Sequence, residues 1–241
     1  MPVLLRSYTF ASSVALASGL WLSPRGIPAT SLALRGGAHG ITSMATTSEN
    51  PLLQQDSLPR FDAIDASHVK EGVQATLTSL EERFAALEAE LANKDTPAYS
   101  DVIEAMESIE APVEYSWGVV NHLMGVKNSD ELRAAHGEVQ PEVIKTTTQL
   151  SQSAAVYAAL EKLSADAGSL DGAQQRIVES SLAGMKLSGV GLEGEQKETF
   201  NANRMELADL STQFSNNLLD ATKAFSLTLT NAADVEGLPP S

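Results

Sequence analysis

The 241-residue sequence contains no cysteine, so disulfide bonds and thiolate metal sites are excluded within this chain. Histidine is also scarce, with four residues, which limits both metal binding and acid–base chemistry. Aromatic residues make up only 5% of the chain, whereas alanine, leucine and glutamate are abundant. Because these residues favour helices over strands, the composition predicts an all-α fold, which we expect to be an antiparallel multi-helix array.

Acidic residues are absent from the first 48 positions, which are rich in serine, alanine, leucine and threonine and carry Arg6, Arg25 and Arg35. This composition is typical of an organellar transit peptide for a chloroplast or a mitochondrion. A moderately apolar run from Phe10 to Leu22 leaves a secretory signal or a bipartite arrangement as alternatives, but it is too short to span a membrane as a helix. We expect residues 1–48 to be a targeting segment that is disordered and cleaved.

The rest of the chain is strongly acidic. It holds all 31 Asp and Glu residues, together with all but three of the 16 Lys and Arg residues. Because such a surface repels phosphate backbones, nucleic acid is excluded as a partner. An acidic surface is most often well solvated, and an electrostatic preference for basic peptides is a second interpretation. We expect no integral membrane segment.

Three apolar stripes at helical spacing each predict a long helix. The first helix is expected to begin near Ser67, the second after Thr96, and the third after Ser129, whose hydroxyl can cap a helix N-terminus. A proline inside a helix removes a backbone hydrogen bond and crowds the preceding turn. We therefore expect Pro112 to kink the second helix and Pro141 to bend or split the third.

The third stripe continues to Leu160, and the pattern then changes. We expect a loop at 166–172, a short helix at 173–185, and a last helix that carries the apolar residues from Phe200 to Leu218. Apolar and polar residues alternate with period two from Phe225 to Thr230, which predicts that the chain enters a strand there.

Residues Gly189 to Gly194 match the pattern Gly-x-Gly-x-x-Gly of dinucleotide-binding turns. That site requires a strand before the turn, because the pyrophosphate lies where a sheet meets a helix. The residues before Gly189 instead have a helical pattern. We interpret the glycines as a helix–helix turn in which glycine permits a positive φ.

The histidines do not form a recognisable metal or catalytic motif. His68 and Glu71 lie three residues apart on one helical face, but polar residues at a helix start are the simpler interpretation. His122 and His136 are isolated, and we expect them to be packing or surface residues. Since neither Glu-x-x-His nor His-Glu-x-x-His occurs, we expect no catalytic residue and no metal ligand in this chain.

Two polar clusters remain. Asn216 and Asn217, with Asp220, are unusual in the middle of a predicted helix, and they could contact a neighbouring domain or a peptide backbone. We favour side chains that bond to local backbone at a helix end. The glutamates between Glu81 and Glu90 are interpreted as a solvated face. The substrate-binding residues stay unknown at this stage.

A series of short segments between Asn50 and Ser241 carries a family resemblance. They are Asn50-Pro51-Leu52-Leu53, Leu58-Pro59, His122-Leu123-Met124 with Val126-Lys127-Asn128-Ser129, Glu131-Leu132-Arg133, Leu187-Ser188-Gly189-Val190-Gly191-Leu192 and Phe214-Ser215-Asn216-Asn217-Leu218-Leu219-Asp220-Ala221. In this order and spacing they resemble the N-terminal helical part of the thimet-type zinc oligopeptidases (peptidase family M3), in particular the oligopeptidase A branch.

The resemblance implies a nearly all-helical enzyme with a deep channel that admits short peptides, in which the N-terminal helices form part of the channel wall. It implies one zinc ion held by a His-Glu-x-x-His helix and a downstream glutamate, all outside this chain. None of these zinc residues matches a position here. Residues 49–241 would then be the N-terminal helical domain of an oligopeptidase, with its own downstream catalytic domain and short peptides as partners.

We therefore expect the N-terminal part of an organellar zinc metalloendopeptidase that turns over short peptides, including cleaved targeting peptides. We interpret the chain as a fragment or a truncated product that is inactive alone and exposes an apolar stripe. The alternative is a non-catalytic helical module that binds peptides or a partner without the protease half. An unrelated helical scaffold would require the ordered segments to match by accident.

Overall fold

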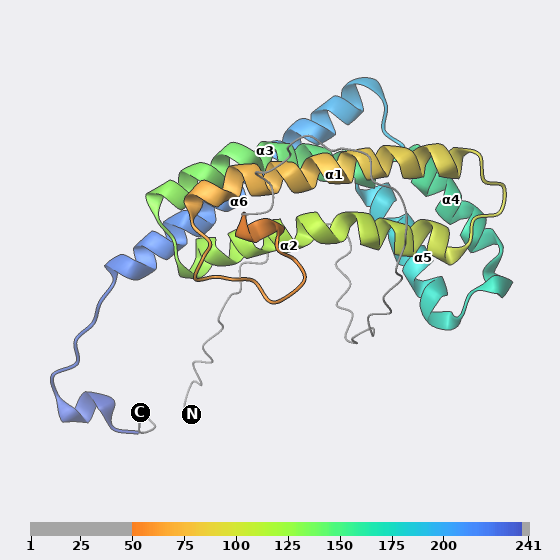
Figure 1. The fold of residues 1–241 in the computed structure, drawn as a ribbon. Helices are drawn as coiled ribbons and strands as arrows, with labels where there is room; N and C mark the ends of the chain where they lie inside the picture. Colours follow the sequence, from red (N-terminus) through yellow and green to blue (C-terminus); the bar gives the residue numbers. More distant parts are fainter. Residues whose placement is uncertain (1–49, 238–241) are drawn as a thin grey trace, which may run out of the picture.

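The computed structural model describes residues 50–237, and this part of the chain folds into helices without a strand (Figure 1). The α-helices are α1 (Ala66–Ala92), α2 (Ala105–Val126), α3 (Asp130–Ser151), α4 (Ala154–Ala165), α5 (Gly172–Leu187) and α6 (Gly194–Ala224). The short elements are η1 (Pro51–Leu53), the π-helical η2 (Ser100–Glu104), η3 (Ala167–Ser169) and η4 (Ala232–Val235). The prediction of an all-α fold is confirmed, and the predicted targeting segment at 1–48 lies outside the described residues.

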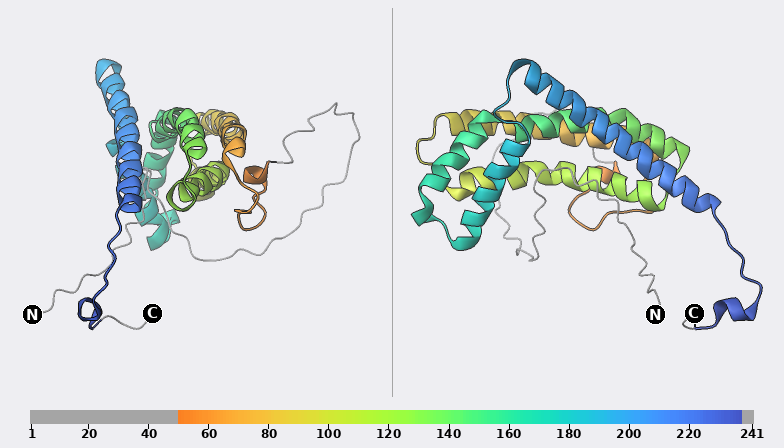
Figure 2. Two further views of the ribbon diagram at one scale, coloured as in Figure 1. Left: turned by 90° about the vertical axis from the view of Figure 1, so that its left-hand side faces the viewer. Right: turned by 180° about the vertical axis from the view of Figure 1, so that it is seen from behind.

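The long helices α1, α2 and α3 lie side by side, with α1 and α3 running in the same direction and α2 antiparallel to both (Figures 1 and 2). α4 and α5 form a helical hairpin at one end of this layer, and α6 crosses the outer side of α3. Among residues 50–237, no helix is both long and apolar enough to cross a bilayer.

α1 forms the centre of the array, because it contacts η1, α2, α3 and α4. Its predicted apolar stripe is buried, and each member is at most 7% exposed: Val69, Val73, Leu77, Leu80, Phe84, Leu87 and Leu91. Burying one large apolar side chain contributes about 1.5–3 kcal/mol. The stripe of α1 is therefore a principal source of the packing free energy that holds its neighbours.

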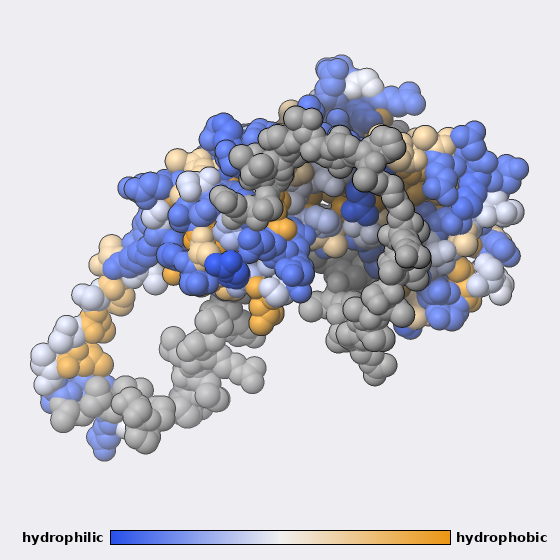
Figure 3. Space-filling view, in the orientation of Figure 1, coloured by the Kyte–Doolittle hydropathy of each residue, from blue (hydrophilic) through white to orange (hydrophobic). Residues whose placement is uncertain are grey.

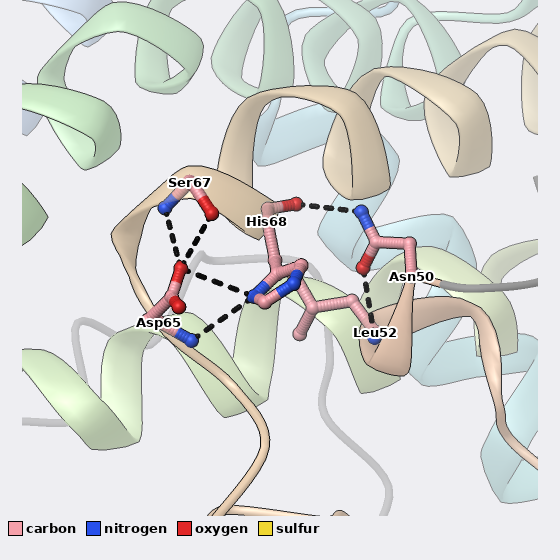
Figure 4. Close-up of polar contacts among 5 residues, drawn as sticks. All are labelled: Asn50, Leu52, Asp65, Ser67 and His68. Carbon is pink, nitrogen blue, oxygen red and sulfur yellow. Dashed lines mark hydrogen bonds and ion pairs between the residues drawn. The ribbon is translucent and has the colours of Figure 1, made fainter. Parts of the chain in front are cut away.

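The start of α1 is fixed by polar contacts (Figure 4). The Asp65 carboxylate caps the helix by accepting the backbone N–H of Ser67 at 2.9 Å, while Nδ1 of His68 accepts the N–H of Asp65 at 3.2 Å. Asn50 adds a contact from outside the helix, because its Nδ2 donates to the His68 carbonyl oxygen at 2.9 Å. The Asn50 Oδ1 also accepts the N–H of Leu52, which is fully buried. These bonds join η1 to the start of α1. The helix begins at Ala66, one residue before the predicted start at Ser67.

The helices continue through both internal prolines. α2 extends past Pro112, and α3 is one helix through Pro141, so the predicted split at Pro141 is wrong. Val139 and Val143 are fully buried on either side, and their packing keeps α3 continuous where Pro141 removes one backbone hydrogen bond. The chain breaks instead between α3 and α4, where the Ser153 hydroxyl accepts a backbone N–H of the first turn of α4 at 3.2 Å.

The predicted strand near Phe225 is also wrong. The segment after α6 has no regular structure up to Thr230, and the described part of the chain offers it no strand with which to pair. Alternation alone does not make a strand, because the backbone groups need a hydrogen-bonding neighbour. Its alternating apolar side chains at Phe225, Leu227 and Leu229 are exposed. Hydrophobic residues are visible on the surface of the segment that extends from the helical array towards the C-terminus (Figure 3).

α6 packs against α3 through polar residues. Gln140 on α3 donates to the Thr212 hydroxyl at 2.8 Å and to the Ala208 carbonyl oxygen at 3.2 Å. Near the other end, the Arg133 guanidinium binds both carboxylate oxygens of Asp220 at 2.6 and 2.9 Å. The apolar stripe of α6 is on the opposite side and is 48–68% exposed: Leu207, Leu210, Phe214 and Leu218. α6 therefore has the reverse of the usual amphipathic arrangement, in which the apolar side faces the core.

The turn between α5 and α6 depends on a glycine. Gly189 has φ +84°, and a Cβ at this position would lie 2.9 Å from Cδ1 of Leu192 and 3.3 Å from the Phe200 ring. The Gln152 amide donates to the neighbouring Ser188 carbonyl oxygen at 2.9 Å, which ties the turn to the end of α3. Since a helix precedes the turn, the interpretation of the Gly-x-Gly-x-x-Gly match as a helix–helix turn is confirmed.

We predict that Gly189→Ala lowers the free energy of unfolding by about 1–3 kcal/mol, because it combines a left-handed backbone with a steric clash. Gly191→Ala is the matched control, since no atom lies within 4 Å of its added Cβ and its φ is not positive. Urea denaturation of the two variants measures the difference. Equal midpoints would contradict the role assigned to Gly189.

Candidate functional site

A pocket of about 410 Å³ lies between α2, α3, α4 and α5. Its lining is mainly apolar, and every one of these helices contributes to it, with a contribution also from Leu80 of α1. The principal apolar lining residues are Val113 and Trp117 of α2, Leu150 of α3, Leu160 of α4 and Met185 of α5. A concave apolar cavity of this size is within the usual range for the binding of small ligands or short peptide segments.

Three glutamates of α2 face the pocket. Glu107, Glu110 and Glu114 are spaced three and four residues apart, so they share one side of the helix. Glu110 is half-buried, whereas the other two are exposed and lie where the pocket meets solvent. The lining residues from the other helices carry no charged side chain. Within residues 50–237, none of the three carboxylates has a cationic partner.

The pocket raises the pKa of two of these carboxyl groups, Glu110 and Glu114. Burial raises the pKa of Glu110 from its ordinary value of 4.5 to about 7, and the negative charges of Glu114 and Glu107 add to the shift. Burial also raises the pKa of Glu114, with a further contribution from Glu107. Both causes would be relieved by a bound cation, because it would replace lost solvation and separate the like charges.

The opposite side of α2 holds the glutamates in place. The Ser116 hydroxyl lies 3.0 Å from the Thr76 hydroxyl of α1, and both groups are buried. Ser108 accepts a bond from the Arg83 guanidinium at 2.8 Å, and the Pro112 carbonyl oxygen accepts one from Gln55 at 2.9 Å. α2 is therefore fixed in rotation, with its acidic side toward the pocket.

The histidines considered from sequence have structural roles. His68 caps α1, and His136 is a buried packing residue that stacks on Trp117 at a centroid distance of 4.5 Å. Burial lowers the pKa of His136 to about 4, so its ring is neutral near pH 7. His122 packs against Phe61 at 5.2 Å. Residues 50–237 bring together no group of three His, Asp or Glu side chains that could hold a metal ion.

The two polar clusters considered from sequence have different outcomes. We expected the Asp220 side chain to bond to local backbone. Instead it pairs with Arg133 of α3. The acidic side of α1 is mostly solvent-exposed, as interpreted, but two of its members also join helices. Glu81 accepts the Thr146 hydroxyl at 2.7 Å, and Glu88 accepts the Ser153 hydroxyl at 2.5 Å.

Sequence reasoning missed the glutamates of α2. Their i, i+3, i+7 spacing was visible, but acidic residues on one side of a helix, as on α1, usually belong to a solvated surface. What distinguishes them is the hollow formed by α4 and α5, which come much later in the chain.

We predict that Glu110→Gln stabilises the protein at pH 8 by about 1–2 kcal/mol and flattens its stability between pH 4.5 and 7. Because the folded-state pKa is raised, the folded state binds more protons than the unfolded state in this window. The free energy of unfolding of the wild-type protein therefore falls as the pH rises from 4.5 to 7, because the buried Glu110 carboxyl group loses its proton. Thermal unfolding over this pH range measures the effect, and Glu82→Gln on the exposed side of α1 is the control. A parallel pH dependence in both variants would contradict the assigned cause.

Comparison with known proteins places this helical array in a family. Residues 73–197 match the family described as "Neurolysin/Thimet oligopeptidase, N-terminal domain". The chain is 42% identical over 203 residues to the probable cytosolic oligopeptidase A of Arabidopsis thaliana, which covers 83% of this chain and 28% of that protein. It is also 42% identical over 205 residues to the organellar oligopeptidase A, chloroplastic/mitochondrial, of the same plant, covering 84% of this chain and 25% of that one.

A bacterial relative shows the same relation. Oligopeptidase A of Salmonella typhimurium is 31% identical over 194 residues, covering 80% of this chain and 28% of the relative. The chain thus spans about a quarter of the length of these relatives. The matched residues include α2 to α5, which form the pocket, and most of α1. The chain therefore belongs to the neurolysin/thimet oligopeptidase family of peptidases and is an oligopeptidase A-like member in its N-terminal domain.

Proposed function

We propose that this chain is the N-terminal part of a zinc metalloendopeptidase that hydrolyses short peptides. The observation that carries the proposal is its match to oligopeptidase A proteins over 80–84% of its own length but 25–28% of theirs. Residues 50–237 do not fit a zinc site, since they contain no suitable group of ligands. Zinc and the hydrolytic chemistry would then belong to the rest of the longer protein.

The pocket supports a role as part of the wall of the substrate channel. Its apolar lining can contact the side chains of a peptide, while Glu110 and Glu114, which have no cationic partner among residues 50–237, favour cationic groups. These contacts would orient a peptide without taking part in bond cleavage. The domain would thus contribute to binding and leave catalysis to the downstream domain.

The proposed location is an organelle, either a chloroplast or a mitochondrion. The support is the acid-free, arginine-containing composition of residues 1–48 and the similarity to an Arabidopsis oligopeptidase A whose name is chloroplastic/mitochondrial. The activity would then be the turnover of peptides inside the organelle, including cleaved targeting peptides.

The exposed apolar side of α6 is the proposed contact with the downstream catalytic domain. Isolated apolar side chains on a surface are ordinary, but an apolar row along one helix that continues into Phe225, Leu227 and Leu229 is typical of an interface. The polar contacts to α3 leave this side free for a partner.

A second candidate function is a non-catalytic module that binds peptides or a partner without a protease half. The observation that favours it is that the pocket is lined completely by residues 80–188, so the chain can form it alone. Peptide binding by the chain would support either function, whereas hydrolysis in a complete enzyme would support only the first.

We predict that the 241-residue chain alone neither hydrolyses peptides nor binds stoichiometric zinc. A chimera tests the proposed function directly: residues 50–237 replace the matching segment of the Arabidopsis cytosolic relative. We expect the chimera to bind zinc and to cleave a fluorogenic peptide, because the pocket side of the domain is retained. The same relative without its N-terminal segment is the control. Turnover by the isolated chain, or a folded, zinc-loaded chimera without turnover, would contradict the proposal.

We predict that the isolated chain self-associates at micromolar concentration through α6, and that Leu210→Ser with Phe214→Ser shifts it toward the monomer. Removing two exposed apolar side chains eliminates apolar area that dimers would bury. Sedimentation velocity measures the shift, with Asn203→Ser and Glu206→Ser as the control at exposed polar positions of the same helix. A wild-type chain that stays monomeric would count against α6 as an interface.

A further inference from the structure

The pocket combines an apolar lining with a group of carboxylates at its edge, and both features favour a bound partner. Its lining is apolar, and at its edge three carboxylates lie together without a cationic partner among the described residues. An occupant that matches both properties places an apolar side chain inside and a basic side chain immediately beside it. Arginine is best suited to the second position, because its planar guanidinium can bind two carboxylates at once.

The chain itself contains such a sequence. Residues 1–48 hold three arginines and no acidic residue, and two of the arginines directly follow a leucine, at Leu5-Arg6 and Leu34-Arg35. Every acidic side chain of the protein lies in residues 49–241, and three of them line the pocket. The two parts of the chain are therefore complementary in charge and in apolar character.

The start of the described chain packs on the side of α2 that faces away from the pocket. Gln55 donates to the Pro112 carbonyl oxygen, and the residues on either side, Ala111 and Val113, both line the pocket. The segment from Arg35 to Asn50 can extend to about 50 Å, which is several times the diameter of one helix, about 10–12 Å. The chain is therefore long enough for Arg35 to reach the pocket around α2. Arg6 is farther along the chain, and the contact does not need it.

We propose that the segment around Leu34-Arg35 docks in this pocket of its own chain, with Leu34 on the apolar lining and the Arg35 guanidinium among Glu107, Glu110 and Glu114. This inference does not depend on peptide hydrolysis.

The ionisation of the pocket agrees with this contact. Burial and the neighbouring carboxylates hold the pKa of Glu110 at about 7, and the arginine side chain favours the ionised carboxylate. The titratable groups that face Glu110 are Glu107 and Glu114 of the same helix, since the lining residues of α1, α3, α4 and α5 carry none. Docking should therefore be stronger at pH 8 than at pH 6.

The absence of cysteine allows a direct test in the full chain. One variant carries Ala33→Cys with Ser180→Cys, which is an exposed position in the pocket lining on α5. The matched control carries Ala33→Cys with Ser79→Cys, an exposed position on α1 outside the pocket. With a short bis-maleimide reagent, we expect intramolecular cross-linking of the first pair to exceed that of the control about tenfold, because docking raises the effective concentration.

Two further changes separate docking from a general attraction to the acidic surface. Arg35→Gln, or Glu110→Gln with Glu114→Gln, should reduce the ratio of the two cross-linking yields, whereas Glu82→Gln with Glu90→Gln on α1 should leave it unchanged. The ratio should also rise from pH 6 to pH 8. Circular dichroism melting confirms that each variant is folded. Equal yields for the two cysteine pairs, or a ratio that both glutamate pairs reduce to the same extent, overturns the proposal.

Discussion

The structure depends on the burial of one continuous apolar stripe on α1. A helix of 27 residues that contacts η1, α2, α3 and α4 gives these elements a common surface, and without it they would share few apolar contacts. The polar contacts at its N-terminus fix where the stripe begins. Gly72 adds to this precision, since a Cβ there would lie 3.0 Å from the fully buried Leu52 of η1. Register along α1 thus determines where every neighbouring helix lies.

The pocket follows from this arrangement. α2 and α3 both pack on α1, and the hairpin of α4 and α5 meets them at one end rather than along their whole length. The remaining space is bounded by Leu80 of α1 and by side chains of α2, α3, α4 and α5. Because α2 is held from behind by Ser116 and Pro112, its glutamates stay on the pocket side. The raised pKa values of Glu110 and Glu114 are a result of packing among helices that are distant in sequence.

The sequence was sufficient where local chemistry decides the structure. The stripe of α1, the cap at Ser129 and the turn at Gly189 were all readable, since spacing, a hydroxyl or a positive φ determines each. Predictions from the sequence were wrong where tertiary contacts override local preference. Pro141 does not interrupt α3, because buried neighbours hold the helix, and Phe225 begins no strand, because pairing needs a second strand. The pocket could not be predicted, because a glutamate on a solvated surface and one in a hollow have the same local sequence pattern.

The reversed polarity of α6 has a consequence for recognition. Apolar contacts are non-directional, so a helix held by them can rotate or slide by small amounts, whereas hydrogen bonds and a bidentate ion pair specify both angle and position. Rotation of α6 would break the bonds of Gln140 to Thr212 and of Arg133 to Asp220 together. Its outward row of side chains is therefore held in one orientation before any partner arrives. Such preorganisation lowers the entropy lost on association, so that a surface of modest area can bind specifically.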